Sequence, residues 1–395
     1  MALGKRKPKQ NSLWVETSQL QARGRHPFYG RVNEILDGAK FDVYVERICG
    51  KYYAPSAGRP SIAPGVYFRC FLIGYFEGID SERGIAYRVS DSLSLREFLG
   101  LSLEEQTPDH STLSKTRRLM SLGTHRAVFR WVLKRLAQEG LLKGKKLGVD
   151  ATALEANAAL RSIVRRDNGA GYGEHVRALM KAEGIEETTP AQRQRFDRRR
   201  KKSLSNREWV NPHDGEARIT RMKDGRTHLA YKAEHAVDLE TGAVVALTVQ
   251  PGDRGDTASM RETLAEAGET VVRVKQEAVE RVVADKGYHS KQALRDLAEV
   301  GVRAMIAEPE RKRQRWTGQS AAQRAVYANR RRLEPKTAKA LMRKRGELIE
   351  RSFAHLYDTG GMRRTHLRGK DNIAKRALLH AAADLPRGVG LADAG

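Results

Sequence analysis

The feature that most constrains the fold is a series of apolar strands and amphipathic helices that begins at Lys146. Residues 146–154 predict one strand, and residues 228–250 alternate around a turn at Glu240-Thr241-Gly242, which predicts two further strands. Helical periodicity then alternates with short apolar segments as far as residue 358. This order of three strands, helix, strand, helix, strand, helix predicts an α/β layer with a mixed five-stranded sheet, antiparallel first and parallel afterwards.

The segment before this series has a helical pattern throughout. Pro64 stands where a helix can begin, and the residues after it are apolar nearly all round, which predicts a buried helix. A helix starting near Asp109 carries Lys115, Arg117 and Arg118. With the helix at 81–89 it could form a helix-turn-helix whose N-terminal residues reach base edges. Ordinary packing between domains is the alternative.

Changes in composition along the chain predict its domains. We expect a basic arm over residues 1–25, a helical domain over 26–145, an α/β domain over 146–385 and a tail over 386–395. The α/β domain contains two basic, irregular insertions, at about 155–226 and 310–340. The first includes Arg198, Arg199 and Arg200, which favour contact with phosphates over a merely solvated helix.

Net charge indicates the class of partner. Lys and Arg number 73 against 48 Asp and Glu, which leaves a formal net charge of +25. An excess on this scale favours a polyanion, because each neutralised phosphate releases condensed counterions. No apolar run is long enough to span a bilayer, and Cys49 and Cys70 have no zinc-binding spacing. We therefore expect a nucleic-acid-binding protein of the cytoplasm, associated with the nucleoid and not with a membrane.

Two aspartates carry the predicted chemistry. Asp150 and Asp285 each follow an apolar strand, so both are expected at strand C-termini. A single aspartate in such a place is more often a cap or turn residue. Two neighbouring carboxylates, however, can share a pair of divalent metals about 4 Å apart that act on a phosphodiester.

A third carboxylate is expected from the helix predicted over residues 341–358, which offers Glu347 and Glu350. Ile349, Phe353 and Leu356 form an apolar stripe that must face the sheet. Glu350 lies at the edge of this stripe, whereas Glu347 falls nearly opposite and should face solvent, paired with Arg343 or Arg351. We therefore predict Glu350 as the third acid.

Several long motifs resemble those of bacterial insertion-sequence transposases with a ribonuclease H-like DDE catalytic domain. They are RPSIAPGVYFRCFLIGYFEGIDSERGIAYRV and TPDHSTLSKTRR in the helical part, GVDATALEANAA around Asp150, RMKDGRTHLAYKAEHAVDLETGAVVA, ADKGYHS around Asp285, and RGELIERSFAHLYDTGGMRRTHLRG around Glu350. The resemblance covers nearly the whole chain. It implies a ribonuclease H-like fold with Asp150, Asp285 and Glu350 as catalytic residues and metal ligands.

The same resemblance implies the reaction and its partners. Transposases of this kind cleave one strand at each transposon end, and the exposed 3′-hydroxyl attacks target DNA. The resemblance implies two Mg²⁺ ions, with Mn²⁺ able to substitute. It also implies double-stranded DNA as the partner, at the inverted-repeat ends and at the target, and a homodimer or higher assembly on that DNA. One common form of the glutamate motif has a tyrosine and an arginine before the acid. Here residue 343 is arginine and residue 346 is glycine, so Arg345 or Arg351 is the candidate substitute.

Residues near these motifs have two interpretations each. Tyr288 and His289 follow Asp285 and could contact DNA, or the tyrosine could pack beneath the loop. His235 is expected to be a core or hydrogen-bonded histidine and not a base. Asn157 and Asp256 could support the site from behind, with N-capping as the alternative for Asp256.

Three functions compete at this point. An active transposase is favoured because all three acidic positions are present. A transposase-derived DNA-binding protein that no longer cuts is the alternative. A structural RNA-binding protein is disfavoured by the strand aspartates. Metal-dependent nicking of a DNA end separates the first from the other two.

Overall fold

The structure is a computed structural model that describes residues 26–54, 61–186, 189–200, 204–222, 224–310 and 315–384. The predicted basic arm (1–25) and tail (386–395) lie outside these residues. In the described part of the chain, no helix is long and apolar enough to cross a membrane.

Seven α-helices precede the sheet, as the helical pattern predicted. They are α1 (Pro27–Gly38), α2 (Phe41–Cys49), α3 (Pro64–Phe76), α4 (Glu82–Ser90), α5 (Leu93–Phe98), α6 (His110–Leu119) and α7 (Leu122–Gln138), with a 3₁₀ turn η2 (Gly50–Tyr52). Helix α3 begins at Pro64 and is buried on nearly every side, as expected from its sequence. The helices share their own hydrophobic core around residues such as Val45, Phe71 and Ile85.

A six-stranded sheet forms the centre of the remaining chain. Its strands are β1 (Lys146–Glu155), β4 (Arg218–Arg221), β5 (Thr227–Asp238), β6 (Val244–Pro251), β7 (Arg281–Ala284) and β8 (Arg303–Ile306). The long strand β5 pairs antiparallel with β1 along one edge and with β6 and β4 along the other. Strands β1, β7 and β8 are parallel neighbours. The path β6-β5-β1-β7-β8 has the order and directions of a ribonuclease H-like sheet, so this prediction is confirmed, with β4 as an unforeseen sixth strand.

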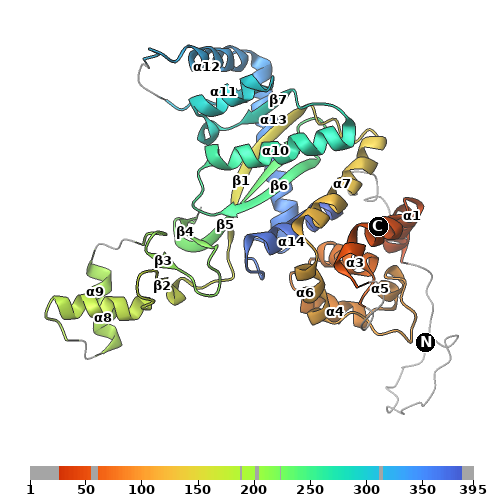
Figure 1. The fold of residues 1–395 in the computed structure, drawn as a ribbon, viewed down its shortest axis with the longest axis horizontal. Helices are drawn as coiled ribbons and strands as arrows, with labels where there is room; N and C mark the ends of the chain where they lie inside the picture. The colour runs from red at the N-terminus through yellow and green to blue at the C-terminus, as the bar shows by residue number, and fades with distance from the viewer. Residues whose placement is uncertain are drawn as a thin grey trace, which may run out of the picture.

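Helices cover both faces of this sheet. Neighbouring residues of β5 point to opposite faces, because side chains alternate along a strand. Glu234 accepts hydrogen bonds from Ser259 and Thr263 of α10 (Asp256–Lys275), whereas His235 bonds Ser352 of α13 (Lys336–Phe353). Helices α10 and α13 therefore lie on opposite faces, and the faces are named after them below (Figure 1).

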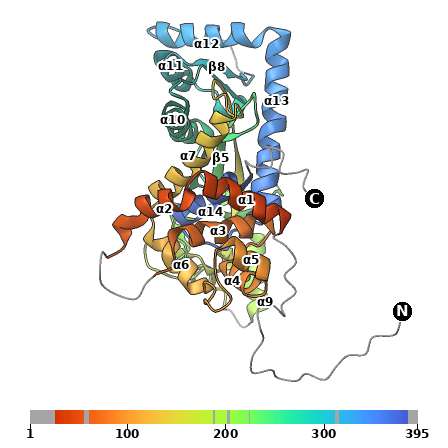
Figure 2. The ribbon, with the colours of Figure 1, turned by 90° about the vertical axis from the view of Figure 1, so that its right-hand side faces the viewer.

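Both predicted irregular insertions contain regular structure. The first includes η3 (Leu160–Ser162), α8 (Tyr172–Ala182), α9 (Pro190–Arg199), β4 and a small sheet of β2 (Val164–Arg165) with β3 (Trp209–Val210). The helices α8 and α9 project at the end of the molecule away from α1–α6 in Figure 1. The second contains α12 (Ser320–Leu333), which lies across the end of α13 in Figure 2. High Arg content hid α9 and α12, because charged side chains weaken apolar periodicity without opposing helix formation. Helix α8 has buried Val176 and Met180 at helical spacing, a signal that was missed.

The C-terminal helices complete the fold. Helix α11 (Lys291–Glu299) packs against β8 and α12. Helix α13 continues as a π-helical segment, η5 (Ala354–Thr359), where a single α-helix was predicted as far as residue 358. Helix α14 (Lys370–Asp384) contacts β6 and also α3 and α7, so it joins the sheet to the N-terminal helices. The predicted domain boundary at residue 145 stays a prediction.

Candidate active site

Asp150 and Asp285 occupy neighbouring positions on two adjacent parallel strands. Lys146, Leu147 and Gly148 of β1 pair in register with Arg281, Val282 and Val283 of β7. The same offset places Asp285 beside Asp150. Asp285 follows the end of β7, as predicted, but Asp150 stands in the middle of β1 and not at a strand end. The reason is that β5 supplies hydrogen-bonding partners to β1 as far as Glu155, so β1 extends beyond the end of its parallel neighbour β7.

Asp150 is held by an arginine from α13. Arg345 Nη1 lies 2.7 Å from Asp150 Oδ2 and donates also to the carbonyl of Val149 at 3.2 Å. Burial raises the pKa of the Asp150 carboxyl, and so does the charge of Asp285, while Arg345 acts in the opposite direction. Gly148 makes this contact possible, because a methyl group there would come within 2.8 Å of Arg345 Cγ.

Asp285 begins a tight 3₁₀ turn, η4 (Lys286–Tyr288). Its Oδ1 accepts a hydrogen bond of 2.8 Å from the backbone N–H of Gly287. The turn returns the chain toward the sheet, so that the side chain of Tyr288 is buried beneath it. The packing interpretation of Tyr288 is therefore the one that the structure supports. His289 is also buried, and direct DNA contact by either side chain has no support in this conformation.

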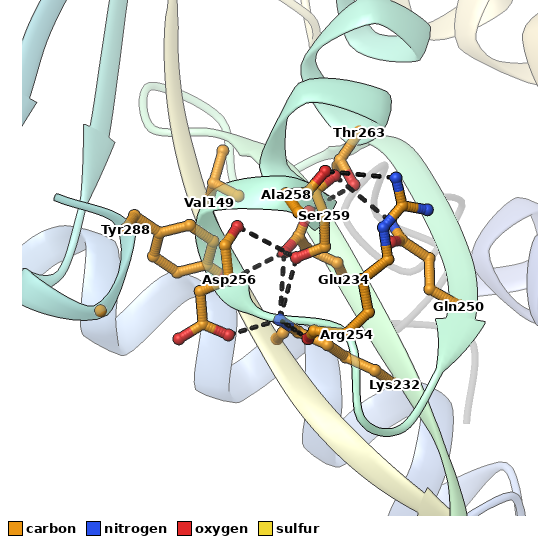
Figure 3. Close-up of polar contacts among 12 residues, drawn as sticks. Val149, Lys232, Glu234, Gln250, Arg254, Asp256, Ala258, Ser259, Thr263 and Tyr288 are labelled. Atoms are coloured by element: carbon orange, nitrogen blue, oxygen red, sulfur yellow. Dashed lines mark hydrogen bonds and ion pairs between the residues drawn. The ribbon is translucent and has the colours of Figure 1, made fainter. Parts of the chain in front are cut away.

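A buried polar network beneath this turn was missed in the sequence. Glu234 is fully buried and accepts hydrogen bonds from the hydroxyls of Ser259, Thr263 and Tyr288 (Figure 3). Burial raises its pKa, against the effect of these hydroxyls and of Lys232. A signal was present in the sequence, because Lys232 and Glu234 lie two positions apart in a predicted strand and must therefore share one face.

The α13 face contains a second buried polar group. His235 Nδ1 lies 2.9 Å from Ser352 Oγ, and its Nε2 lies 2.6 Å from the Tyr357 hydroxyl. Burial lowers the pKa of His235 to about 3, so the ring is neutral near pH 7. The prediction of a hydrogen-bonded core histidine is confirmed.

The predicted orientation of α13 is confirmed for its apolar stripe. Ile349, Phe353 and Leu356 are all buried, although Leu356 belongs to the π-helical segment. Both candidate glutamates are exposed. Glu347 pairs with Arg351 at 2.8 Å, as one of its two predicted partners.

Glu350 lies near a different set of residues. The pKa of Arg363 is raised, mainly by its hydrogen bond to Asp358 and to a smaller degree by the charge of Glu350. Arg363 also donates to Thr152 Oγ1 at 2.9 Å, two residues beyond Asp150 on the same face of β1. Glu350 is therefore on the correct side of the sheet for the predicted role.

The residues fit a divalent metal by type and in part by position. Mg²⁺ prefers carboxylate oxygens, and Asp150 and Asp285 supply two at neighbouring register positions. Among the described residues, however, no three His, Cys, Asp or Glu side chains are gathered closely enough to hold an ion. Glu350 is thus not assembled with the two aspartates in this conformation.

The basic candidates fall into two groups. Lys115, Arg118, Arg198 and Arg199 are exposed on α6 and α9, where DNA contact stays a prediction. Arg117 is buried and its Nε donates to Glu82 at 2.6 Å, so it packs α6 against α4 instead of reaching outward. Helix α5 also lies between α4 and α6 in the chain, so these two helices are not joined by a single turn as a helix-turn-helix would require.

Two further candidates have structural partners. Arg200 donates to Asp197 at 2.8 Å and to the Tyr172 hydroxyl at 2.9 Å. Asn157 Nδ2 donates to the His366 carbonyl, which ties the end of β1 to the segment after η5. Asn157 therefore supports the chain around β1 and not an aspartate directly.

Comparisons with known families agree with this architecture. Residues 16–119 match the family described as Transposase domain (DUF772), and residues 196–383 match the family described as Transposase DDE domain. Among solved structures, the Mos1 transposase paired-end complex with left transposon end is similar at 11% identity and a TM-score of 0.21, over 78% of this chain and 82% of that one. No curated protein matches the sequence significantly.

A mixed sheet of this strand order defines the class as a ribonuclease H-like fold. The two family matches together cover most of the chain, in the N-terminal helices and in the sheet domain. The chain belongs to the insertion-sequence transposases that carry a DDE domain.

Proposed function

We propose that this chain catalyses metal-dependent cleavage of DNA at the ends of an insertion sequence and transfer of the cut strand to target DNA. The observation that carries the proposal is the placement of Asp150 beside Asp285 on adjacent central strands. A metal pair bound there would activate the attacking water or 3′-hydroxyl and stabilise the leaving oxygen of the phosphodiester. Mg²⁺ is the proposed ion, with Mn²⁺ as a substitute.

Each side chain has a defined part in this proposal. Asp150 and Asp285 supply the carboxylate oxygens from the sheet, and Glu350 supplies the third from α13. Since Glu350 is exposed and apart from the aspartates, its approach requires a shift of the helix or its side chain. Arg345 orients the Asp150 carboxylate from the α13 side.

Double-stranded DNA is the proposed partner. A net charge of +25 supports it, as do the exposed cations Lys115, Arg118, Arg198 and Arg199. Binding should weaken steeply as salt is raised, because each phosphate contact releases counterions.

The test uses the full chain and labelled DNA that carries the inverted repeats flanking its own gene. With Mg²⁺ or Mn²⁺, the wild type should nick at the repeat end, whereas Asp150→Asn and Asp285→Asn should bind the same DNA without cutting it. DNA of random sequence is the control substrate. If the wild type binds the ends specifically and never cleaves, the non-cutting DNA-binding protein replaces the proposed enzyme.

A further inference from the structure

The network beneath the Asp285 turn extends from Glu234 to another acidic residue, Asp256. Asp256 is the first residue of α10, and its Oδ1 accepts a hydrogen bond from the ammonium group of Lys232. Lys232 is itself buried, with Nζ also 2.9 Å from Ser259 Oγ and 3.2 Å from the Arg254 carbonyl. Figure 3 shows Lys232, Asp256 and Ser259 converging from β5 and α10. Asp256 is therefore held from inside the protein although its side chain is 43% exposed.

The other carboxylate oxygen of Asp256 faces the turn that positions Asp285. A methyl group on Gly287 would lie 2.5 Å from Asp256 Oδ2 and 3.1 Å from Asp285 Oδ1. The two carboxylates thus flank the same glycine. Gly287 also donates its N–H to Asp285 Oδ1. A displacement of Gly287 would consequently move the oxygen of Asp285 that the turn holds.

The turn is fixed at two points by the same buried lysine. Tyr288 donates to Glu234, whose Oε1 lies 4.0 Å from Lys232 Nζ, while Asp256 bonds Lys232 directly and approaches Gly287. Lys232 lies between Glu234 and Asp256, so it offsets the repulsion of placing these two carboxylates close together. Asp256 therefore limits the position of Gly287 from the α10 side.

We propose that Asp256 is a positioning residue for Asp285, acting through its close approach to Gly287 and its ion pair with Lys232. The inference rests on the proposed function, since it concerns the geometry of the same metal-binding site. Asp256 does not need to touch the metal in this role. It restricts where the Asp285 carboxylate can lie before metal and DNA arrive.

A double-mutant cycle between Asp256 and Gly287 tests this. Asp256→Ala and Gly287→Ala should each weaken Mn²⁺ binding to the full chain by roughly 10- to 100-fold, the usual effect of losing a residue that orients a metal ligand. In the Asp256→Ala background the added methyl group no longer meets the carboxylate 2.5 Å away. The double variant should therefore be no weaker than the single variants, because the two changes act on one contact.

Mn²⁺ affinity is measured by electron paramagnetic resonance without DNA, and cleavage is measured separately across Mn²⁺ concentrations. Asp256→Ala should require more Mn²⁺ and recover most of its rate when saturated, whereas a merely structural loss would lower thermal stability and the saturated rate. Glu262→Ala is the matched control, because Glu262 is an exposed carboxylate of the same helix paired with Arg254 at 2.9 Å. Its Mn²⁺ affinity should equal that of the wild type.

Further variants separate the possible outcomes. If Asp256→Ala fails to fold, Asp256→Asn keeps the shape of the side chain and should still bind Mn²⁺ more weakly. Wild-type Mn²⁺ affinity in that variant, or effects that multiply in the double variant, would overturn the positioning role. If instead the wild type neither binds Mn²⁺ nor cleaves, the proposed function fails and the positioning role fails with it. Loss of Mn²⁺ binding in Asp285→Asn together with normal binding in Asp256→Ala would overturn the positioning role alone.

Discussion

The two faces of the sheet hold the catalytic candidates in different ways. On the α10 face, the turn after Asp285 rests on Glu234, Lys232 and Asp256, which are connected by several hydrogen bonds. On the α13 face, Asp150 is held by the single side chain of Arg345, and Glu350 is exposed. Under the proposed function, the Asp285 side of the site is therefore preformed and the Glu350 side is adjustable, because Glu350 has to move to join the two aspartates.

The largest expected effect concerns the adjustable face. Glu350→Gln should reduce cleavage by at least roughly a thousand-fold, since losing a metal ligand removes several kcal/mol of transition-state stabilisation. DNA binding should persist in a gel-shift assay at the same protein concentrations. Glu347→Gln is the control, because Glu347 is exposed and paired with Arg351 of the same helix. If the Glu347 variant were inactive and the Glu350 variant active, the third acid would be Glu347 and the prediction of Glu350 would be wrong.

An intermediate effect is expected on the preformed face. Glu234→Ala should lower the free energy of unfolding by about 3 kcal/mol, because it leaves the hydroxyls of Ser259, Thr263 and Tyr288 without the buried carboxylate that accepts their hydrogen bonds. It also removes a buried negative charge 4.0 Å from Lys232 Nζ. Chemical denaturation monitored by circular dichroism measures the change. Glu262→Ala should change the free energy of unfolding by less than about 1 kcal/mol, as exposed ion pairs do. If the two variants changed the free energy of unfolding equally, the Glu234 network on the α10 face would contribute no more to stability than an exposed ion pair does.

The smallest expected effect is a pH dependence of stability that comes from His235, a buried residue of the α13 face. The pKa of His235 is about 3 in the folded chain and near 6.5 when unfolded. Between these values the unfolded state binds one proton more, so stability falls as the pH falls, by about 1.4 kcal/mol per pH unit. His235→Gln should remove this slope and be about 2 kcal/mol less sensitive than the wild type to a change from pH 7 to pH 5. Denaturation curves of both proteins across this range give the comparison, and an equal pH dependence would mean that folding does not lower the pKa of His235.

Strand periodicity and family motifs were sufficient for five of the six strands and for the neighbouring placement of the two aspartates, but not for β4 or for the position of Asp150 within its strand. The hairpin around Glu240–Gly242, the parallel strands and the buried stripe of Ile349 and Phe353 all follow local patterns, so each could be predicted from neighbouring residues. The Arg-rich helices α9 and α12 could not, because charged side chains weaken their apolar periodicity. Helix α8 is different, because its buried residues Val176 and Met180 have helical spacing, so a local signal was present and was missed.

The position of each charge was decided only by the tertiary structure. Arg117 and Arg118 are adjacent in the sequence, yet Arg117 is buried against Glu82 and Arg118 is exposed. Lys232, Asp256 and Tyr288 come from three separate elements, and no local pattern reports that they meet beneath Asp285. The sequence by itself determined which residues alternate inward, because that depends on the geometry of single helices and strands. Partnership between buried charges depends on how the elements pack, since a buried charge is tolerated only where another element supplies its partner.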